Sequence, residues 1–434
     1  MTVERPTTEK EVLEMSKNYN FYTWSPQKTA LEHIAVKSGE GCYFYDYEGN
    51  KYLDAASQLV NLNIGFQNQK VVDAIKAQAD QLCYIGPSYS TDIRAMLGKK
   101  IITEIVPDMG KVLFTLGGAD ANEYALRIAN SYTGRYKIFS QYLSYHGSTY
   151  GAAMLNGQAE RGNIDPGIAG FVHFLGPWWR DHGLKFESEA EYTAFLLRML
   201  ERQLIQEGPD KVAAIITESM QGGGGAVPMP EGYMKGIRAL CDKYGILMIC
   251  DEVMVGFGRT GKWFTYMHYD VQPDIITFAK GSTCGYTPLG GVIVSKKIAD
   301  YFEEVSLPAG LTYNAHPICC AAALATLEVY QEENLIENSR VMGERVLNGL
   351  KELCQKHKSI KNPRGMGLMT GVDFAPELMQ HFGKIKNMFM EKRCLPYVLP
   401  PRILVTPPLI VTAEEVDTIL KTMDEVLTET DTWF

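Results

Sequence analysis

A lysine stands directly after a short apolar segment and directly before a glycine. This residue is Lys280, in DIITFAKGST. Taken alone, a lysine at the end of a strand most often extends its charge into water. In a site that destabilises its charged form, however, the neutral amine can attack an aldehyde. Lys280 is therefore a candidate for covalent chemistry, with a solvated lysine as the alternative.

An acidic residue ends a second apolar segment, 29 positions earlier in the chain. This residue is Asp251, in GILMICDEVMVGFGRTG. Burying a carboxylate there is costly unless it has a partner. The partner could be a protonated ring nitrogen, with a structural ion pair as the alternative. An acid and an amine on two strand ends are the groups that pyridoxal 5′-phosphate (PLP) needs, because the acid keeps the ring charged and the amine holds the aldehyde.

Two further segments fit the same cofactor. In GGADANEYALR, small residues at 117–119 precede a helix expected to start near Asp120, where backbone N–H groups and the helix dipole favour a phosphate. Alone this signal is weak, since it is neither GxGxxG nor a Walker A loop. In SYHGSTYGA, Tyr145 beside His146 could lay its ring over a flat heteroaromatic, with a core tyrosine as the alternative. Four elements that fit one cofactor make coincidence improbable.

The segments that must position these residues alternate between helices and short apolar strands from about residue 70. Short buried strands separated by helices indicate a mostly parallel sheet that is covered on both faces, with ligands at the carboxyl ends of the strands. The expected strands are KVLFTL, YKIFSQ, KVAAIITES, GILMICDEV and DIITFAK.

The two ends of the chain differ from this middle part. Residues 41–57 predict a β-hairpin that turns at Glu48-Gly49-Asn50, and the chain after about residue 320 is rich in helices. RILVTPPLIVT predicts a strand, and Thr412 is expected to cap a terminal helix. We expect residues 1–65 to belong to a smaller domain with residues 316–434, and residues 66–315 to form a larger PLP-binding domain.

Composition narrows the class of protein. The 434 residues carry a formal net charge of −9, which argues against nucleic-acid binding. The polar N-terminus and the lack of a long apolar run predict a cytoplasmic protein without a membrane span. Nine scattered cysteines show no zinc spacing, so no metal site is expected, and Cys319 and Cys320 are expected to be buried thiols.

The sequence resembles the class III (ω-amino acid type) PLP-dependent aminotransferases over nearly its whole length. The resemblance implies α/β PLP fold type I (aspartate aminotransferase-like): a large domain on a mostly parallel, seven-stranded-type sheet and a smaller α+β domain. It also implies a homodimer or higher homo-oligomer with active sites at the subunit interface. The matching segments are GGADANEYALR, YHGSTYGA, TESMQGGGG, DEVMVGFGRTGKWF, FAKGSTCGYTPLGG, LTYNAHP and PPLIVT.

The resemblance also implies roles for individual residues. Lys280 would be the Schiff-base lysine, and Asp251 would pair with the pyridine nitrogen. Gly118 and Ala119 would bind the phosphate. Tyr145, with His146 beside it, would contact one face of the ring, and Val253 would contact the opposite face. Glu218 and Gln221 would line the site, and Thr312 would reach the phosphate of the neighbouring subunit.

Three positions depart from the ornithine and γ-aminobutyrate members of the family. Leu404 and Gly223 stand where those members carry an arginine and the glutamate that neutralises it. Met254 stands where they often have a glutamine near the cofactor's phenolic oxygen, so the partner of that oxygen is unassigned. Arg402 lies two positions before Leu404 on the same face of the expected strand, and it could bind a substrate acid group, with a surface arginine as the alternative.

At these positions the sequence is similar to the amine–pyruvate and taurine–pyruvate subgroup of the family. The segments NFYTWSPQ and SQLVNLNIG are similar to the same subgroup. In that subgroup N-terminal aromatic residues wall the substrate pocket, which points to Tyr22 and Trp24. Val60 stands where some amine transaminases have a large aromatic residue. The expected function is a ping-pong transfer of an amino group from a taurine-type donor, a β-amino acid or a simple amine to a keto acid, expected to be pyruvate.

Two other functions use the same residues. A PLP-dependent racemase, epimerase or aminomutase on this scaffold would turn over one substrate without a keto acid. A protein that kept only the fold would lack the yellow colour of bound PLP, although intact Lys280, Asp251 and Tyr145 argue against it.

Overall fold

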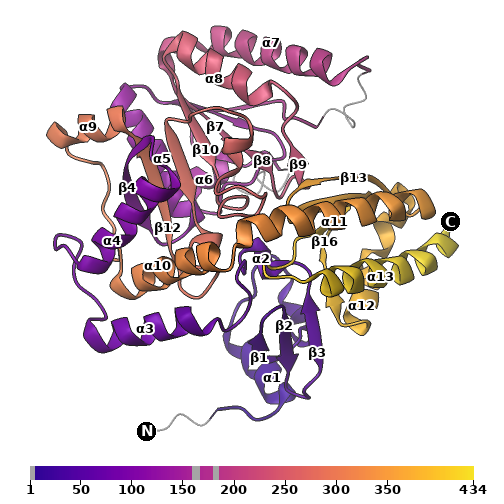
Figure 1. Ribbon diagram of the computed structural model, residues 1–434. Coiled ribbons are helices and arrows are strands. Elements are labelled where there is room, and N and C mark those ends of the chain that lie inside the picture. The colour runs from indigo at the N-terminus through magenta and orange to yellow at the C-terminus, as the bar shows by residue number, and fades with distance from the viewer. Residues whose placement is uncertain (1–4, 159–166, 179–184) are drawn as a thin grey trace.

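A seven-stranded sheet forms the centre of the computed structural model, which describes residues 5–158, 167–178 and 185–434 (Figure 1). Its strand order is β4-β12-β11-β10-β7-β5-β6. Only β12 runs against its neighbours β11 and β4, so the expected mostly parallel sheet is confirmed. The strands are β4 (Met109–Thr115), β5 (Lys137–Gln141), β6 (Phe171–Phe174), β7 (Val212–Glu218), β10 (Leu247–Asp251), β11 (Ile275–Phe278) and β12 (Gly290–Ser295).

Both faces of this sheet are buried, as the sequence predicts. Ile249 packs toward α5, whereas its neighbour Met248 packs toward the opposite side of the sheet in the cluster that includes α7 and α8. This alternation follows from the two-residue period of a strand. The surrounding helices are α3 (Gln69–Gln81), α4 (Asp92–Lys100), α5 (Gly118–Thr133), α6 (Tyr150–Leu155), α7 (Glu189–Glu207), α8 (Tyr233–Tyr244), α9 (Lys296–Glu304) and α10 (Pro317–Glu332).

The two ends of the chain meet in smaller sheets. β3 of the predicted hairpin pairs with β15, so residues near position 53 lie beside residues near position 394. A second sheet has the order β13-β14-β17-β16, with α11 packed against it and α13 packed against α11 (Figure 1). The elements are α1 (Glu9–Tyr19), β1 (Val36–Glu40), β2 (Tyr43–Asp46), β3 (Lys51–Asp54), α2 (Ser57–Val60), α11 (Leu335–Lys356), β13 (Ile360–Met366), β14 (Met369–Phe374), α12 (Phe382–Glu391), β15 (Cys394–Leu395), β16 (Tyr397–Leu399), β17 (Arg402–Val405) and α13 (Ala413–Thr430).

Several local predictions can be compared with these elements. Thr412 caps α13 in a capping box with Glu415, as expected. α5 begins at Gly118, two residues before the predicted start. α4 is followed directly by a wider π-helical turn from Ile101. β6 and the reversed β12 were not predicted from the sequence. The domain boundaries at 65 and 315 stay a prediction.

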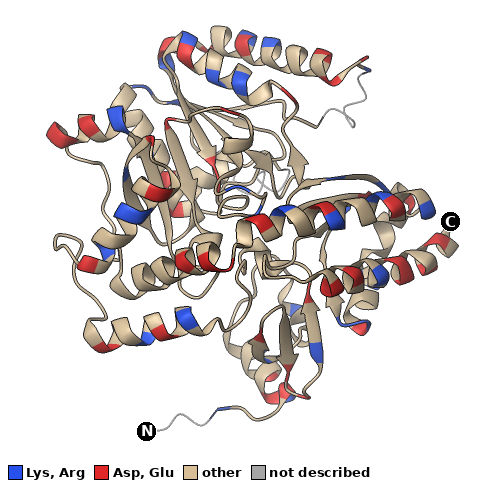
Figure 2. Ribbon diagram, viewed as in Figure 1, with Lys and Arg blue, Asp and Glu red and all other residues tan. Residues whose placement is uncertain are grey.

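Charge and cysteine placement agree with a buried sheet. Many Lys, Arg, Asp and Glu residues lie on outer helices such as α7, α11 and α13, whereas the central strands carry few charged residues (Figure 2). All nine cysteines are free; Cys319 and Cys320 are buried as expected, whereas Cys83 is exposed. Among the residues that the structure describes, no helix is long and apolar enough to cross a membrane.

Candidate active site

A cavity of about 830 Å³ lies at the carboxyl ends of β7, β10 and β11. This volume falls within the range that small-molecule sites occupy. Nine of the residues given a site role from the sequence line it: Trp24, Gly118, Ala119, Tyr145, His146, Glu218, Asp251, Val253 and Lys280. Gly223 and Met254, two of the three departures, also line it. The structure thus brings together segments that lie more than 250 residues apart in the chain.

Lys280 follows β11 in a backbone conformation that is uncommon for a residue with a side chain. Its φ is +42°, and its carbonyl accepts hydrogen bonds from the N–H groups of Thr283 (3.3 Å) and Cys284 (2.9 Å). Burial lowers the pKa of the Lys280 amine, although the carboxylates of Asp251 and Glu218 act in the opposite direction. A lowered pKa keeps more of the amine neutral, which is the form that attacks a carbonyl.

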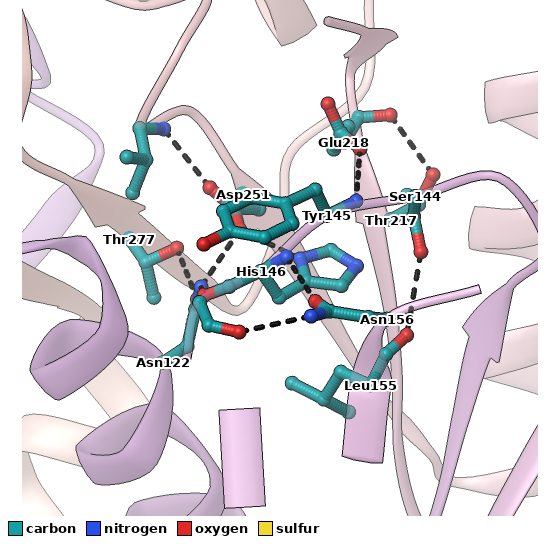
Figure 3. Close-up of polar contacts among 12 residues, drawn as sticks. Asn122, Ser144, Tyr145, His146, Leu155, Asn156, Thr217, Glu218, Asp251 and Thr277 are labelled. Carbon is teal, nitrogen blue, oxygen red and sulfur yellow. Dashed lines mark hydrogen bonds and ion pairs between the residues drawn. The ribbon is translucent and has the colours of Figure 1, made fainter. Parts of the chain in front are cut away.

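The Asp251 carboxylate is 3% exposed and is held by three donors (Figure 3). Its Oδ1 accepts from the backbone N–H of Val253 (2.9 Å), and its Oδ2 accepts from Asn122 Nδ2 and from His146 Nδ1 (2.8 and 2.7 Å). A carboxylate has about four acceptor directions. One direction therefore remains, on Oδ1, for a donor such as the N–H of a heteroaromatic ring.

The first turn of α5 provides a place for a phosphate. Gly117, Gly118 and Ala119 line the cavity, and the first hydrogen bond within the helix runs from Ala121 N to Gly117 O (3.0 Å). The N–H groups of Gly118 and Ala119 precede that bond and lie at the positive end of the helix dipole. A side chain on Gly117 would meet nothing within 4 Å, so open space adjoins this turn.

Two side chains of different kinds could contact a flat ring in this cavity. Tyr145 is held by a hydrogen bond between its hydroxyl and Ser148 Oγ (2.8 Å). Val253 approaches the start of α5 so closely that a Cβ on Gly118 would lie 2.6 Å from its Cγ1. The cavity therefore holds a group suited to each part of such a cofactor: the α5 turn for a phosphate, Asp251 for a basic ring nitrogen and Lys280 for an aldehyde. The residues of the cavity fit PLP.

Glu218 adds a second buried acid to the cavity wall. It lies opposite Asp251 in the register of β7 and β10, and it is 3% exposed. Its two oxygens accept from the N–H groups of Tyr145 (2.9 Å) and Gly222 (2.7 Å). Burial, reinforced by the charge of Asp251, raises the pKa of Glu218 to about 7. Glu218 therefore exchanges its proton near neutral pH.

The structure places three other predicted residues away from the cavity wall. The Tyr22 ring contacts His33 edge-on at 4.3 Å, and its neighbours Thr23 and Trp24 line the cavity instead. Val60 is 1% exposed and packs in an apolar cluster with the fully buried Leu404, while the following Asn61 lines the cavity. Gln221 is buried and donates to the carbonyl of Tyr142 (2.9 Å).

Arg402 and Thr312 also lie outside the wall of this chain's cavity. The Arg402 guanidinium donates to the carbonyl of Gly223 (3.3 Å) and to that of Gly224, and Gly223 itself lines the cavity. Thr312 is exposed, and its carbonyl accepts from the hydroxyl of Tyr84 (2.9 Å). The backbone of Gly223 and Gly224 thus lies between the Arg402 guanidinium and the cavity, and Thr312 is exposed at the surface of this chain.

Asn122 is a site residue that the sequence analysis missed. It is fully buried and bonds to Asp251. The signal was present in GGADANEYALR, where an amide stands four residues after Gly118, between Ala121 and Glu123. Such a residue on the buried face of a helix needs polar partners, and the strand ends are the nearest source of them.

Comparisons with known proteins agree with this geometry. The family model described as "Aminotransferase class-III" matches residues 24–427. A taurine–pyruvate aminotransferase of Bilophila wadsworthia is 36% identical over 387 residues, which cover 85% of this chain and 83% of that protein. A diaminobutyrate–2-oxoglutarate transaminase of Halomonas elongata is 32% identical, with 95% of each chain covered.

A solved structure extends the similarity to the fold. The taurine:2-oxoglutarate aminotransferase of Bifidobacterium kashiwanohense, in complex with PLP and glutamate, is 41% identical with a TM-score of 0.94, and 99% of each chain is covered. The expected fold type I architecture and the PLP cofactor are thereby confirmed. The chain belongs to the class III aminotransferases and is a PLP-dependent transaminase.

Proposed function

We propose that this enzyme transfers the amino group of a taurine-type ω-amine to a keto acid by a ping-pong mechanism. The observation that carries the proposal is the convergence of Lys280, Asp251 and the α5 turn on one cavity. The names of the relatives support the donor class, since two of them are named for taurine. β-Amino acids and simple amines are the competing donors within this class.

Each cofactor-end residue would have a distinct task in this reaction. PLP, when bound, supplies an aldehyde that holds the amino group and a ring that accepts electrons from the adjacent carbon. The Lys280 Nζ atom would take the proton from the donor carbon and return it to the cofactor. Asp251 Oδ1 would hold the ring N–H, and the N–H groups of Gly118 and Ala119 would bind the phosphate. Tyr145 would exclude water from one face of the ring.

We propose Arg402 as the group that binds the acid end of the substrate. Lys280 is the only lysine or arginine among the described residues that line the cavity, and its amine is needed for the amino-group transfer. The Arg402 guanidinium lies behind Gly223, where family members with a glutamate would neutralise an arginine. A sulfonate or carboxylate could exchange with the glycine carbonyls for this fork of donors.

We also propose a homodimer in which Thr312 of the partner subunit completes the phosphate site. Thr312 is exposed in this chain and does not line its own cavity. Mixed dimers of a Lys280→Ala chain with a Thr312→Val chain test this assignment. If Thr312 acts on the neighbouring site, one site of the mixed dimer keeps both an intact Lys280 and an intact Thr312. We therefore expect the mixed dimer to be more active than a dimer of either variant alone.

A half-reaction screen tests the proposed donor and acceptor. The PLP-loaded enzyme is mixed with taurine, β-alanine or a simple alkylamine, and loss of the visible absorbance band is followed. We expect taurine to discharge the band fastest, and either pyruvate or 2-oxoglutarate to restore it. Catalytic turnover of one substrate without any keto acid would instead indicate an isomerase, and a colourless protein that binds no PLP would contradict the proposal.

A further inference from the structure

The side-chain amide of Asn122 lies between two neighbouring strand ends. Its Nδ2 atom donates to Asp251 Oδ2 (2.8 Å) and to the carbonyl of His146 (2.7 Å), and its Oδ1 atom accepts from Thr277 Oγ1 (2.8 Å) (Figure 3). Asn122 and Thr277 are both 0% exposed. Every partner of this amide is thus a protein group.

The orientation of the Asn122 amide follows from these partners. The carbonyl of His146 can only accept a hydrogen bond, and the Asp251 carboxylate does the same, so both require the NH₂ group of Asn122. The Thr277 hydroxyl then donates to the amide oxygen. Thr277 lies opposite Asp251 in the register of β10 and β11, so one strand supplies the acid and its neighbour supplies the group that orients the amide.

We propose that Asn122 is a positioning residue that decides which oxygen of Asp251 meets the cofactor's ring nitrogen. Asn122 and His146 together occupy Oδ2, which leaves the free acceptor direction on Oδ1. Thr277 keeps the Asn122 amide from flipping, and a flipped amide would point its own oxygen at the carboxylate. This inference rests on the proposed role of Asp251.

The test compares PLP with its 1-deaza analogue, in which a carbon replaces the ring nitrogen. Asn122→Leu keeps the approximate volume but removes the donor to Asp251. If Asn122 acts through Asp251 on the ring nitrogen, the apparent dissociation constant of PLP should rise roughly tenfold or more, whereas that of the analogue should change less than about twofold. An equal weakening of both ligands would overturn the proposal, because it would show a structural role only.

Two further variants keep the test decisive if Asn122→Leu fails to fold. Thr277→Val removes only the hydroxyl that orients the amide, and we expect a smaller, roughly three- to fivefold, effect confined to PLP. Thr217→Val is the matched control, because its buried hydroxyl donates to the Gln141 amide (2.9 Å) and does not contact Asp251. Equal behaviour of Thr277→Val and Thr217→Val toward PLP would contradict the proposal.

Asp251→Asn, measured in parallel, separates this inference from the proposed function. If Asp251→Asn weakens PLP and its analogue equally, the role of Asp251 itself is wrong. If Asp251→Asn is selective for PLP and Asn122→Leu is not, the proposed function stands and the positioning role of Asn122 fails.

Discussion

The proposed cofactor end and the proposed substrate end of the cavity are built in different ways. At the cofactor end, Asp251 is 3% exposed and has three donors, and Glu218 is equally buried with two. At the substrate end, Trp24 is 74% exposed and nearby Phe21 is 92% exposed. Strand ends and a helix start hold the first set, whereas a loop of the N-terminal arm (residues 5–35) carries the second.

The glycines at 222–225 mark the border between these ends. Gly222 donates its N–H to Glu218 on the cofactor side, and Gly223 and Gly224 accept from Arg402 on the other side. A Cβ on Gly225 would lie 2.8 Å from Arg364 Nη2 and 3.0 Å from Arg402 Nη1. The φ of Gly225 is +122°, so a side chain at this position would also strain the backbone.

This difference separates two kinds of effect. Changes at the cofactor end should reduce turnover with every substrate, because each substrate uses the same proton transfers. Changes at the substrate end should alter the ranking of substrates and leave the cofactor in place. Variants at each end therefore test whether this division holds.

The largest effect is expected at Lys280. Lys280→Ala should lower turnover by at least about 10⁴-fold with every amine and remove the visible band, because neither the covalent link nor the proton transfer can occur. Lys280→Arg is the matched variant, since a guanidinium keeps the charge but stays protonated. Turnover in either variant near the level of the unmodified enzyme would contradict the assignment.

Arg402 should produce a smaller effect that depends on the substrate. Arg402→Gln keeps a donor for the glycine carbonyls but removes the charge, so half-saturation by taurine should require about 10- to 100-fold more substrate. An alkylamine without an acid group should be unaffected in the half-reaction. Arg345→Gln, at an exposed ion pair with Asp417, serves as the surface control. Equal loss with taurine and the alkylamine would place Arg402 in a structural role.

The cofactor end was also the part that the sequence predicted best. Asp251 and Lys280 end apolar strands, and the strand period together with the parallel-sheet rule is enough to expect them at one edge. The spacing of GGADANEYALR likewise predicted the start of α5 to within two residues. Each of these patterns is local in the sequence, and the parallel sheet brings the residues at its strand ends close together.

The substrate end could not be predicted in the same way. Val60 was expected in the pocket, but it lies in α2, where residues 57, 58 and 60 have positive φ values and the backbone departs from helical geometry at residues 58 and 59. A strand or helix period gives no guidance through such a turn. Asn122 was missed for another reason, since its importance comes from Thr277 and Asp251, which lie more than 120 residues away in the chain.

A pH series tests the burial of the cofactor end. The pKa of Glu218 is raised to about 7 from its ordinary value of 4.5, so the folded state holds this proton more firmly than the unfolded state does. Glu218 therefore lowers the free energy of unfolding as pH rises from about 5 to 8, by on the order of 2 kcal/mol. Glu218→Gln should flatten this dependence in urea titrations, whereas exposed Glu231→Gln should not.

The smallest effect is expected at Trp24, and it tests how far the open substrate end contributes. The Trp24 ring contacts the Tyr145 ring edge-on, with the two ring centroids 6.5 Å apart, and so joins the N-terminal arm to the cofactor end. Such contacts are worth about 0.5–1.5 kcal/mol, so Trp24→Ala should change kcat/KM by roughly 2- to 10-fold and should do so more for bulky amines than for taurine. Phe21→Ala removes an even more exposed aromatic residue that does not line the cavity, and it should have no effect. If Trp24→Ala instead matched the loss at Lys280, the arm would act on the chemistry itself, and the contrast between the two ends would not hold.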